Sequence, residues 1–195
     1  MKNGRQRLLV EGNDDKHVVL SLCQKYNFCE NFEIKDCRGI DGLEEQIAVQ
    51  LKESDMKTLG IMIDADIDLQ SRWNSVKNKL ISCGFRVPND LPETGLITEN
   101  ERQKTGVWIM PDNNTNGMLE DFISFLVPKD DKLLPIADST LNDIERQKLN
   151  KYSIAHKSKA RIHAWLAWQE TPGTPLGLRS QKNTCQRTEK FVINL

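Results

Sequence analysis

The chain of 195 residues lacks the sequence features of several large protein classes. No apolar run approaches the roughly 20 residues that a membrane-spanning helix needs, and no apolar signal core follows the N-terminus. The five cysteines form no CxxC pair, and their odd number argues against a disulfide framework. No phosphate-binding loop of the type GxxxxGK followed by Ser or Thr occurs. These absences predict a cytoplasmic protein with no membrane partner, no structural zinc and no P-loop ATPase domain of its own.

An excess of charge of one sign is also missing, because 28 acidic residues nearly balance 27 basic ones. The balance is uneven along the chain. Residues 145–190 contain ten Lys or Arg and three Glu, a net charge of +7, which leaves −8 on the remainder. An acidic body beside a basic segment favours a metal-binding site next to a surface that binds a polyanion. The alternative is that the basic segment is an ordinary solvated helix face.

Apolar periodicity predicts strands that alternate with helices, which indicates an α/β fold with a mainly parallel sheet. The run at 58–63 is apolar on both faces, as in a central parallel strand. Strands are predicted at 7–10, 31–37, 58–63, 95–98 and 106–110. Helices are predicted after an N-cap at Asn13 or Asp14, around 43–51 and 73–80, and at 118–126, 141–150 and 157–169. Residues 128–140 are predicted to be irregular, and residues 191–193 to form a final strand or helical turn.

Carboxylates follow two of the predicted strands. Glu11 comes directly after the first strand, and Asp64, Asp66 and Asp68 follow the third. Alternation along an extended segment would point the three aspartates to one side, although Asp68 could instead cap the next helix. Since ligands of parallel α/β sheets bind beyond the carboxyl ends of the strands, these carboxylates predict a site for Mg²⁺ or Mn²⁺. An EF-hand loop is excluded, because neither its glycine nor its bidentate glutamate stands at the required position.

The two acidic motifs together resemble those of a Toprim domain. Glu11-Gly12 follows an apolar strand, and about fifty residues later another apolar strand ends in Asp64-Ala65-Asp66. The Toprim domain is the catalytic module shared by type IA and type II topoisomerases, bacterial primases, recombination proteins and the nucleases of the overcoming-lysogenisation-defect (OLD) group. The resemblance covers about residues 5–125. It implies a Toprim, Rossmann-like fold with a catalytic core at 5–127 and a basic, mostly helical extension at 128–195 packed on that core.

The resemblance also implies roles for individual residues. Glu11 matches the Toprim glutamate, which acts as a general acid or base or binds metal, and Asp64 and Asp66 match the metal-binding aspartates. OLD nucleases have a further aspartate four residues after that glutamate, which is Asp15 here. Asp15 could equally compensate the dipole of a helix. The implied cofactor is Mg²⁺ or Mn²⁺, bound as two ions.

Residues beyond the first three strands complete the implied site. Glu120 and Asp121 match a later acidic pair of the OLD group, although acidic residues are common at helix starts. Lys159 matches a lysine that assists catalysis in that group, and Lys157 is the next best match. The basic segment would hold a nucleic-acid backbone without reading its sequence. Its predicted contacts are Lys148, Lys151, Lys157 and Arg161.

The chain also departs from the larger Toprim enzymes. It lacks the tyrosine-bearing domain of topoisomerases, the zinc-binding and polymerase regions of primases, and the ATPase domain of full OLD proteins. It therefore resembles a stand-alone Toprim protein, which could act with a separate ATPase or another partner, or as an oligomer. The expected function is metal-dependent cleavage of DNA or RNA, with a non-catalytic nucleic-acid-binding or assembly module as the alternative. A nucleotide-binding or other phosphoryl-transfer α/β protein is a third alternative, but it would need a glycine-rich phosphate loop after a strand.

Overall fold

A computed structural model describes residues 5–173 and 176 of the chain. Its centre is a five-stranded sheet in the order β2-β1-β3-β5-β4, in which all neighbours pair in parallel except β4 and β5. The strands are β1 (Arg5–Val10), β2 (Glu33–Asp36), β3 (Met56–Asp64), β4 (Leu96–Glu99) and β5 (Lys104–Met110). The predicted α/β class with a mainly parallel sheet is therefore confirmed.

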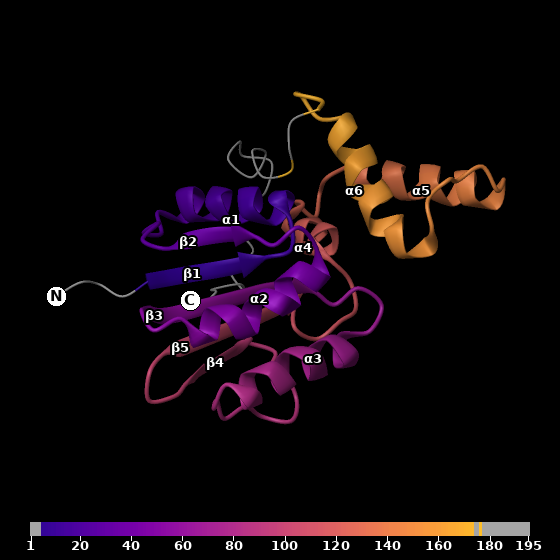
Figure 1. The fold of residues 1–195 in the computed structure, drawn as a ribbon. Coiled ribbons are helices and arrows are strands. Elements are labelled where there is room, and N and C mark those ends of the chain that lie inside the picture. Colours follow the sequence, from indigo (N-terminus) through magenta and orange to yellow (C-terminus); the bar gives the residue numbers. More distant parts are fainter. Residues whose placement is uncertain (1–4, 174–175, 177–195) are drawn as a thin grey trace.

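Helices cover both faces of the sheet and extend beyond it (Figure 1). They are α1 (Asn13–Tyr26), α2 (Ile40–Lys52), α3 (Leu69–Ser82), α4 (Leu119–Leu126), α5 (Leu133–Arg146) and α6 (Lys157–Ala167), with a short 3₁₀ turn, η1 (Ile154–His156). Helices α1 and α4 pack on one face, and α2 and α3 on the other. Among the residues that the structure describes, no helix is long and apolar enough to cross a membrane.

Alternation along the strands divides the core into two layers. On β1, Leu8 and Val10 pack in the layer of α1, α4 and α6, whereas Leu9 packs in the layer of α2 and α3. Strand β3 repeats the pattern, since Met62 belongs to the first layer and Ile63 to the second. Burial on both faces explains why the sequences of these two strands are apolar throughout.

The prediction that residues 128–140 are irregular is wrong, because α5 begins at Leu133. Pro135 argues against a helix in the sequence, but it is the third residue of α5, where a missing N–H costs no helical hydrogen bond. The Oδ1 atom of Asp131 accepts the N–H groups of Leu133 (2.9 Å) and Leu134 (2.7 Å). The first turn of α5 is thus capped from the preceding loop.

Helices α5 and α6 form a pair beyond the carboxyl ends of the parallel strands (Figure 1). Ala137 from α5 and Ile162 and Trp165 from α6 are buried in the core layer of α1 and α4. The pair therefore packs on the sheet domain and brings one side of α6 toward the ends of the strands. The element predicted at 191–193 lies outside the described residues.

Candidate functional site

The carboxyl ends of β1 and β3 bring the two predicted acidic motifs together. The strands are neighbours and pair in parallel, with Leu9 opposite Ile61. Glu11 therefore follows β1 beside the end of β3, and its Oε1 atom accepts the backbone N–H of Asp64 at 2.7 Å. The convergence of the motifs requires that these two strands be neighbours in one sheet, and they are.

The first turn of α1 adds a carboxylate to this edge of the sheet. Asp15 is 8% exposed, and its Oδ2 atom accepts the N–H of Gly12 at 2.9 Å. Gly12 has extended backbone and directly precedes the helix, so the predicted N-cap at Asn13 or Asp14 is wrong. The helix start is stabilised instead by Asp15, which reaches back to the Gly12 amide.

Helix α4 begins beside the end of β3. The Oδ1 atom of Asp64 accepts the N–H of Leu119, the first residue of α4, at 3.0 Å. The next residue, Glu120, is 4% exposed, and its Oε2 atom has no hydrogen-bond partner within the described part of the chain. A buried carboxylate oxygen without a partner costs free energy. The contacts among the described residues therefore do not explain why a glutamate is buried at position 120.

Burial disturbs the ionisation of four carboxyl groups, which we call the acidic cluster: Glu11, Asp15, Asp64 and Glu120. Burial raises the pKa of Asp64 to about 9, and the charges of the other three members raise it as well. Burial also raises the pKa of Asp15 to about 7, and it raises the pKa values of Glu11 and Glu120. The four groups cannot all be ionised at neutral pH unless a cation balances them.

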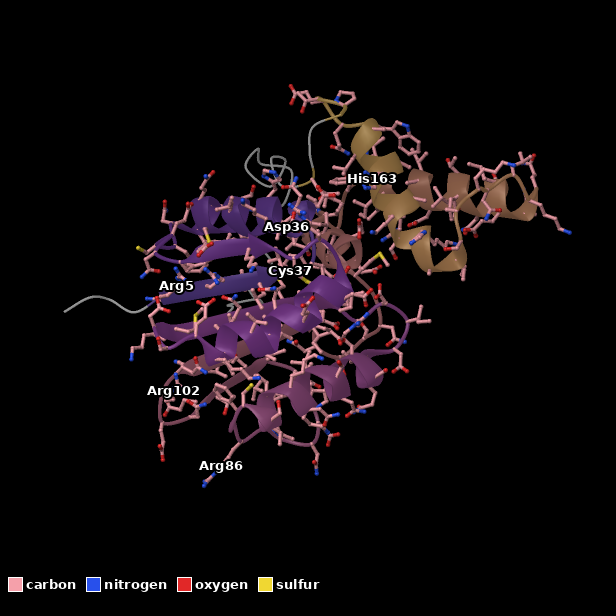
Figure 2. All side chains as sticks on the ribbon, in the orientation of Figure 1. Arg5, Asp36, Cys37, Arg86, Arg102 and His163 are labelled. Atoms are coloured by element: carbon pink, nitrogen blue, oxygen red, sulfur yellow. The ribbon has the colours of Figure 1, made fainter. Side chains whose placement is uncertain are left out.

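Helix α6 brings Lys159 and His163 within electrostatic reach of the acidic cluster. The charge of Lys159 opposes the rise in the pKa values of Glu11 and Glu120, and His163 acts in the same way on Glu120. The two residues are four apart and so share a face of α6; Figure 2 marks His163 on that helix. Lys159 was predicted to belong to the site. His163 was missed, although its spacing from Lys159 was an available signal.

The side chains of Asp66 and Asp68 do not continue the arrangement that begins with Asp64. Strand β3 ends at Asp64, and Asp66 adopts a left-handed backbone conformation with a φ of 53°. Its Oδ2 atom lies 2.8 Å from Nη2 of Arg72, and its side chain is 44% exposed. Asp68 caps α3, since its Oδ1 atom accepts the N–H of Ser71 at 2.9 Å. The expectation that the three aspartates point to one side is wrong, because the extended backbone on which it rests stops at Asp64.

Asp121 is used to build the start of α4. Its Oδ2 atom accepts the N–H of Met118 at 2.9 Å, and its Oδ1 atom accepts the hydroxyl of Ser158 on α6 at 2.6 Å. Both carboxylate oxygens therefore have partners inside the protein. Of the predicted acidic pair, Glu120 joins the acidic cluster, and Asp121 fixes the two helices that border it.

The predicted nucleic-acid contacts are divided between paired and exposed side chains. Nζ of Lys157 lies 2.7 Å from Oε2 of Glu145. Arg161 donates to Asp138 through Nε at 2.5 Å and through Nη2 at 3.0 Å. The exposed members are Lys148 and Lys151. Four further basic residues of this segment, at positions 179, 182, 187 and 190, lie outside the described residues.

The acidic cluster is not a finished metal site. Within residues 5–173 and 176, no three side chains of His, Cys, Asp or Glu are arranged so that they could hold a metal ion as they stand. Glu11, Asp15 and Asp64 each direct one oxygen to a backbone N–H. Cation binding would therefore require some of these side chains to turn toward a shared ion.

Comparison with known proteins places the chain in a family. Residues 5–194 match the sequence profile of the family described as "Protein of unknown function (DUF3226)". The chain belongs to this family. No curated protein and no solved structure matches the chain. The DUF3226 match runs from β1 past the end of α6, so it includes the acidic cluster together with Lys159 and His163.

Proposed function

We propose that this chain cleaves phosphodiester bonds of DNA or RNA with the help of Mg²⁺ or Mn²⁺, in a site of the Toprim type. The observation that carries the proposal is the buried Glu120 carboxylate, whose Oε2 atom lacks a hydrogen-bond partner among the described residues. It belongs to a cluster of four carboxyl groups whose pKa values are all raised by burial, and in Asp64 and Asp15 also by other members of the cluster, which is typical of functional sites. The Toprim resemblance of Glu11-Gly12 and Asp64-Ala65-Asp66 points to the same place.

The donor set suits a hard divalent cation. Carboxylate oxygens are the ligands that Mg²⁺ prefers, and a cation would offset the repulsion that contributes to the raised pKa of Asp64. Asp15 and Glu120 would hold one ion and Asp64 and Asp66 a second, and Glu11 is a further candidate ligand. When bound, two such ions supply an activated water molecule and stabilise the leaving oxygen of a phosphodiester.

The chain's own residues would bind and orient the substrate. Glu11 fixes the backbone at Asp64 through its 2.7 Å hydrogen bond, and burial raises its pKa, which favours a role in proton exchange. Lys159 would neutralise negative charge that develops on the phosphoryl oxygens. Lys148 and Lys151 would contact backbone phosphates without reading their sequence. As the OLD resemblance implies, a separate ATPase or another cytoplasmic protein would be the partner.

A cleavage assay with a matched pair of variants tests the proposal. Supercoiled plasmid and single-stranded RNA are incubated with Mg²⁺ or Mn²⁺ and with wild type, Asp64→Asn or Asp36→Asn. Asp36 ends β2 as Asp64 ends β3, but it lies on the edge strand, where its Oδ1 atom accepts the N–H of Arg38 at 2.8 Å. We expect wild type and Asp36→Asn to cleave, and Asp64→Asn to lose about a thousandfold of the rate or more.

Two other outcomes would contradict the proposal. Cleavage that survives in Asp64→Asn would place the chemistry elsewhere in the molecule. Binding of nucleic acid by every form, with no cleavage under any metal condition, would favour the non-catalytic module instead.

A further inference from the structure

Arg72 connects the two aspartates of the Asp64-Ala65-Asp66 motif. Its Nε atom donates to the backbone carbonyl of Asp64 at 2.9 Å, and its Nη2 atom donates to Oδ2 of Asp66 at 2.8 Å. The Arg72 side chain is 17% exposed, so this ion pair is shielded better than a pair on the open surface. One guanidinium thus holds both the end of β3 and the carboxylate of Asp66.

Backbone hydrogen bonds independent of Arg72 hold the main chain at and around Asp66. Its N–H donates to the carbonyl of Gly117 at 2.8 Å, and the N–H of Asp68 donates to the carbonyl of Ala65 at 3.2 Å. Removal of the guanidinium would therefore free the Asp66 side chain while leaving these backbone hydrogen bonds in place.

Glu44 on α2 is the weaker carboxylate partner of Arg72. Its Oε1 atom lies 3.6 Å from Nη1 of Arg72, beyond hydrogen-bond distance. Glu44 has its own partners, since it accepts the hydroxyl of Ser75 at 2.8 Å and lies 3.3 Å from Nζ of Lys79. Asp66 is therefore the main carboxylate partner of Arg72. Both side chains border a hollow of about 360 Å³, which gives the guanidinium room to move away.

We infer that Arg72 is a positioning residue that commits Asp66 to an internal ion pair, so that the free protein takes up one divalent cation, at the acidic cluster. Asp66 becomes a ligand for a second cation only when the guanidinium leaves it. The inference rests on the proposed metal-dependent function and adds the order in which the site is filled. Because a guanidinium binds phosphate as well as carboxylate, a phosphodiester is the kind of anion that would draw Arg72 away from Asp66.

Electron paramagnetic resonance of bound Mn²⁺ tests this inference without measuring activity. Wild type is titrated beside Arg72→Gln, Arg72→Lys and Lys79→Gln. Lys79 is the matched control, because it is a cation of the same helix that pairs with Glu44. We expect one tightly bound Mn²⁺ in wild type, Arg72→Lys and Lys79→Gln. In Arg72→Gln we expect two, with the second bound about tenfold more tightly than in wild type, since removing a nearby positive charge favours a cation.

An Asp66→Asn variant gives an independent result even if Arg72→Gln does not fold. Asp66 is not a ligand in the free protein under this inference. The variant should therefore keep one tight Mn²⁺ with wild-type affinity, whereas the double variant Arg72→Gln/Asp66→Asn should lack the second ion.

The outcomes separate this inference from the proposed function. Two equivalent ions in wild type, loss of the tight ion in Asp66→Asn, or one or no ion in folded Arg72→Gln would each overturn the inference and leave a metal site in place. One or no ion in folded Arg72→Gln is also the result expected if Arg72 only stabilises the structure. No bound Mn²⁺ in wild type would overturn the proposed function itself.

Discussion

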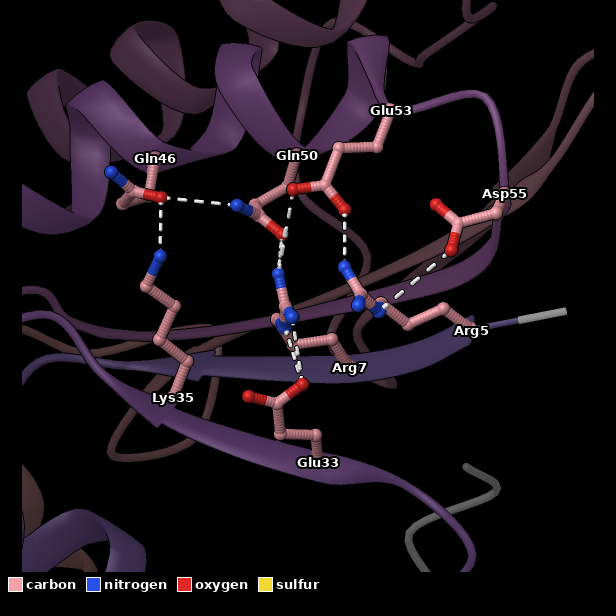
Figure 3. A network of polar contacts seen from close by, with 8 residues as sticks. All are labelled: Arg5, Arg7, Glu33, Lys35, Gln46, Gln50, Glu53 and Asp55. Atoms are coloured by element: carbon pink, nitrogen blue, oxygen red, sulfur yellow. Dashed lines mark hydrogen bonds and ion pairs between the residues drawn. The ribbon is translucent and has the colours of Figure 1, made fainter.

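The two ends of the sheet differ in whether their charged side chains are paired with opposite charges. At the amino end of β1, Nη1 of Arg5 donates to Glu53 at 2.8 Å, and Nη2 of Arg7 donates to Glu33 at 2.7 Å. Gln50 on α2 completes this network by accepting a hydrogen bond from Arg7 (Figure 3). At the carboxyl end, the acidic cluster brings four carboxyl groups together, with cations at its margin on α3 and α6.

The ionisation of the carboxyl groups follows this difference. The hydrogen bond from Arg7 lowers the pKa of Glu33, whereas burial raises the pKa of Asp64 to about 9. A sheet end whose charges are matched within the protein serves the fold. A sheet end with a surplus of buried negative charge needs protons or an outside cation, which is why we assign function to the carboxyl end.

Removing a cation from the margin of the acidic cluster should slow cleavage strongly. Lys159→Met should slow cleavage about a hundredfold, because a positioned cation that neutralises developing charge contributes about 2.7 kcal/mol. Lys157→Met is the matched control, since Nζ of Lys157 is already paired with Glu145 at 2.7 Å, and it should cleave nearly as fast as wild type. Initial rates on the substrate of the wild-type protein measure both. Equal losses in the two variants would contradict the role of Lys159.

Supplying a cation should stabilise the carboxyl end of the sheet. Mg²⁺ at about a hundred times its Kd should raise the free energy of unfolding by about 2.7 kcal/mol, and a chelator should reverse this. The gain should be larger at about pH 8 than at about pH 6, because the cation displaces protons from groups such as Asp64, whose pKa is about 9. Urea unfolding with and without Mg²⁺ measures the effect. The same gain in Asp64→Asn would show that the ion binds elsewhere.

Disrupting the amino end should affect stability alone. Arg7→Met removes the donor to Glu33 and to Gln50, and Gln50 is only 2% exposed. We expect the free energy of unfolding to fall by about 2 kcal/mol, since a buried polar group loses a partner. Mn²⁺ affinity should remain that of wild type. A change in that affinity would show that the two ends of the sheet are coupled.

The pH dependence of stability should distinguish the two ends by its sign. Without metal, folded Asp64 keeps its proton up to about pH 9, whereas the unfolded chain loses it near about pH 4. Because the folded state then binds more protons, the free energy of unfolding should fall as pH rises through this range, by up to about 1.4 kcal/mol per unit. Glu33 acts in the opposite direction, because its lowered pKa gives stability that is lost as pH falls.

Chemical unfolding of metal-free protein at several pH values checks this last prediction. Asp64→Asn should have a shallower slope than wild type above about pH 4. An unchanged slope would mean that Asp64 does not hold the proton that its burial implies.

The sequence predicts the backbone of the candidate site better than its side chains. Two apolar runs indicated the buried strands β1 and β3, and their parallel pairing is sufficient to bring Glu11 to Asp64. The side chain of Asp66 could not be placed in this way. Its left-handed backbone depends on the carbonyl of Gly117, which is distant in sequence. The contacts of Arg72 could not be predicted either, because in sequence it is one polar residue of an amphipathic helix.

Adjacent acids at a helix start are also alike in sequence. Glu120 and Asp121 differ in their contacts because they occupy the second and third positions of α4. The third position reaches back to the amide of Met118, so Asp121 becomes a cap, while Glu120 remains buried with an oxygen lacking a partner within the described residues. The start of a helix cannot be predicted from sequence to within one residue, so the sequence does not show which of the two acids is the cap.

Gly117 has a consequence for the evolution of the family. Its φ of 147° favours glycine, a Cβ there would lie 2.7 Å from Oδ2 of Asp121, and its carbonyl accepts the N–H of Asp66. A family member that does not need the acidic cluster could replace Glu120 with an apolar residue at little structural cost, because Oε2 of Glu120 has no hydrogen-bond partner within the described residues. It cannot exchange Gly117 without rebuilding the entrance to α4. We therefore expect Gly117 to persist even in family members that have lost these acids.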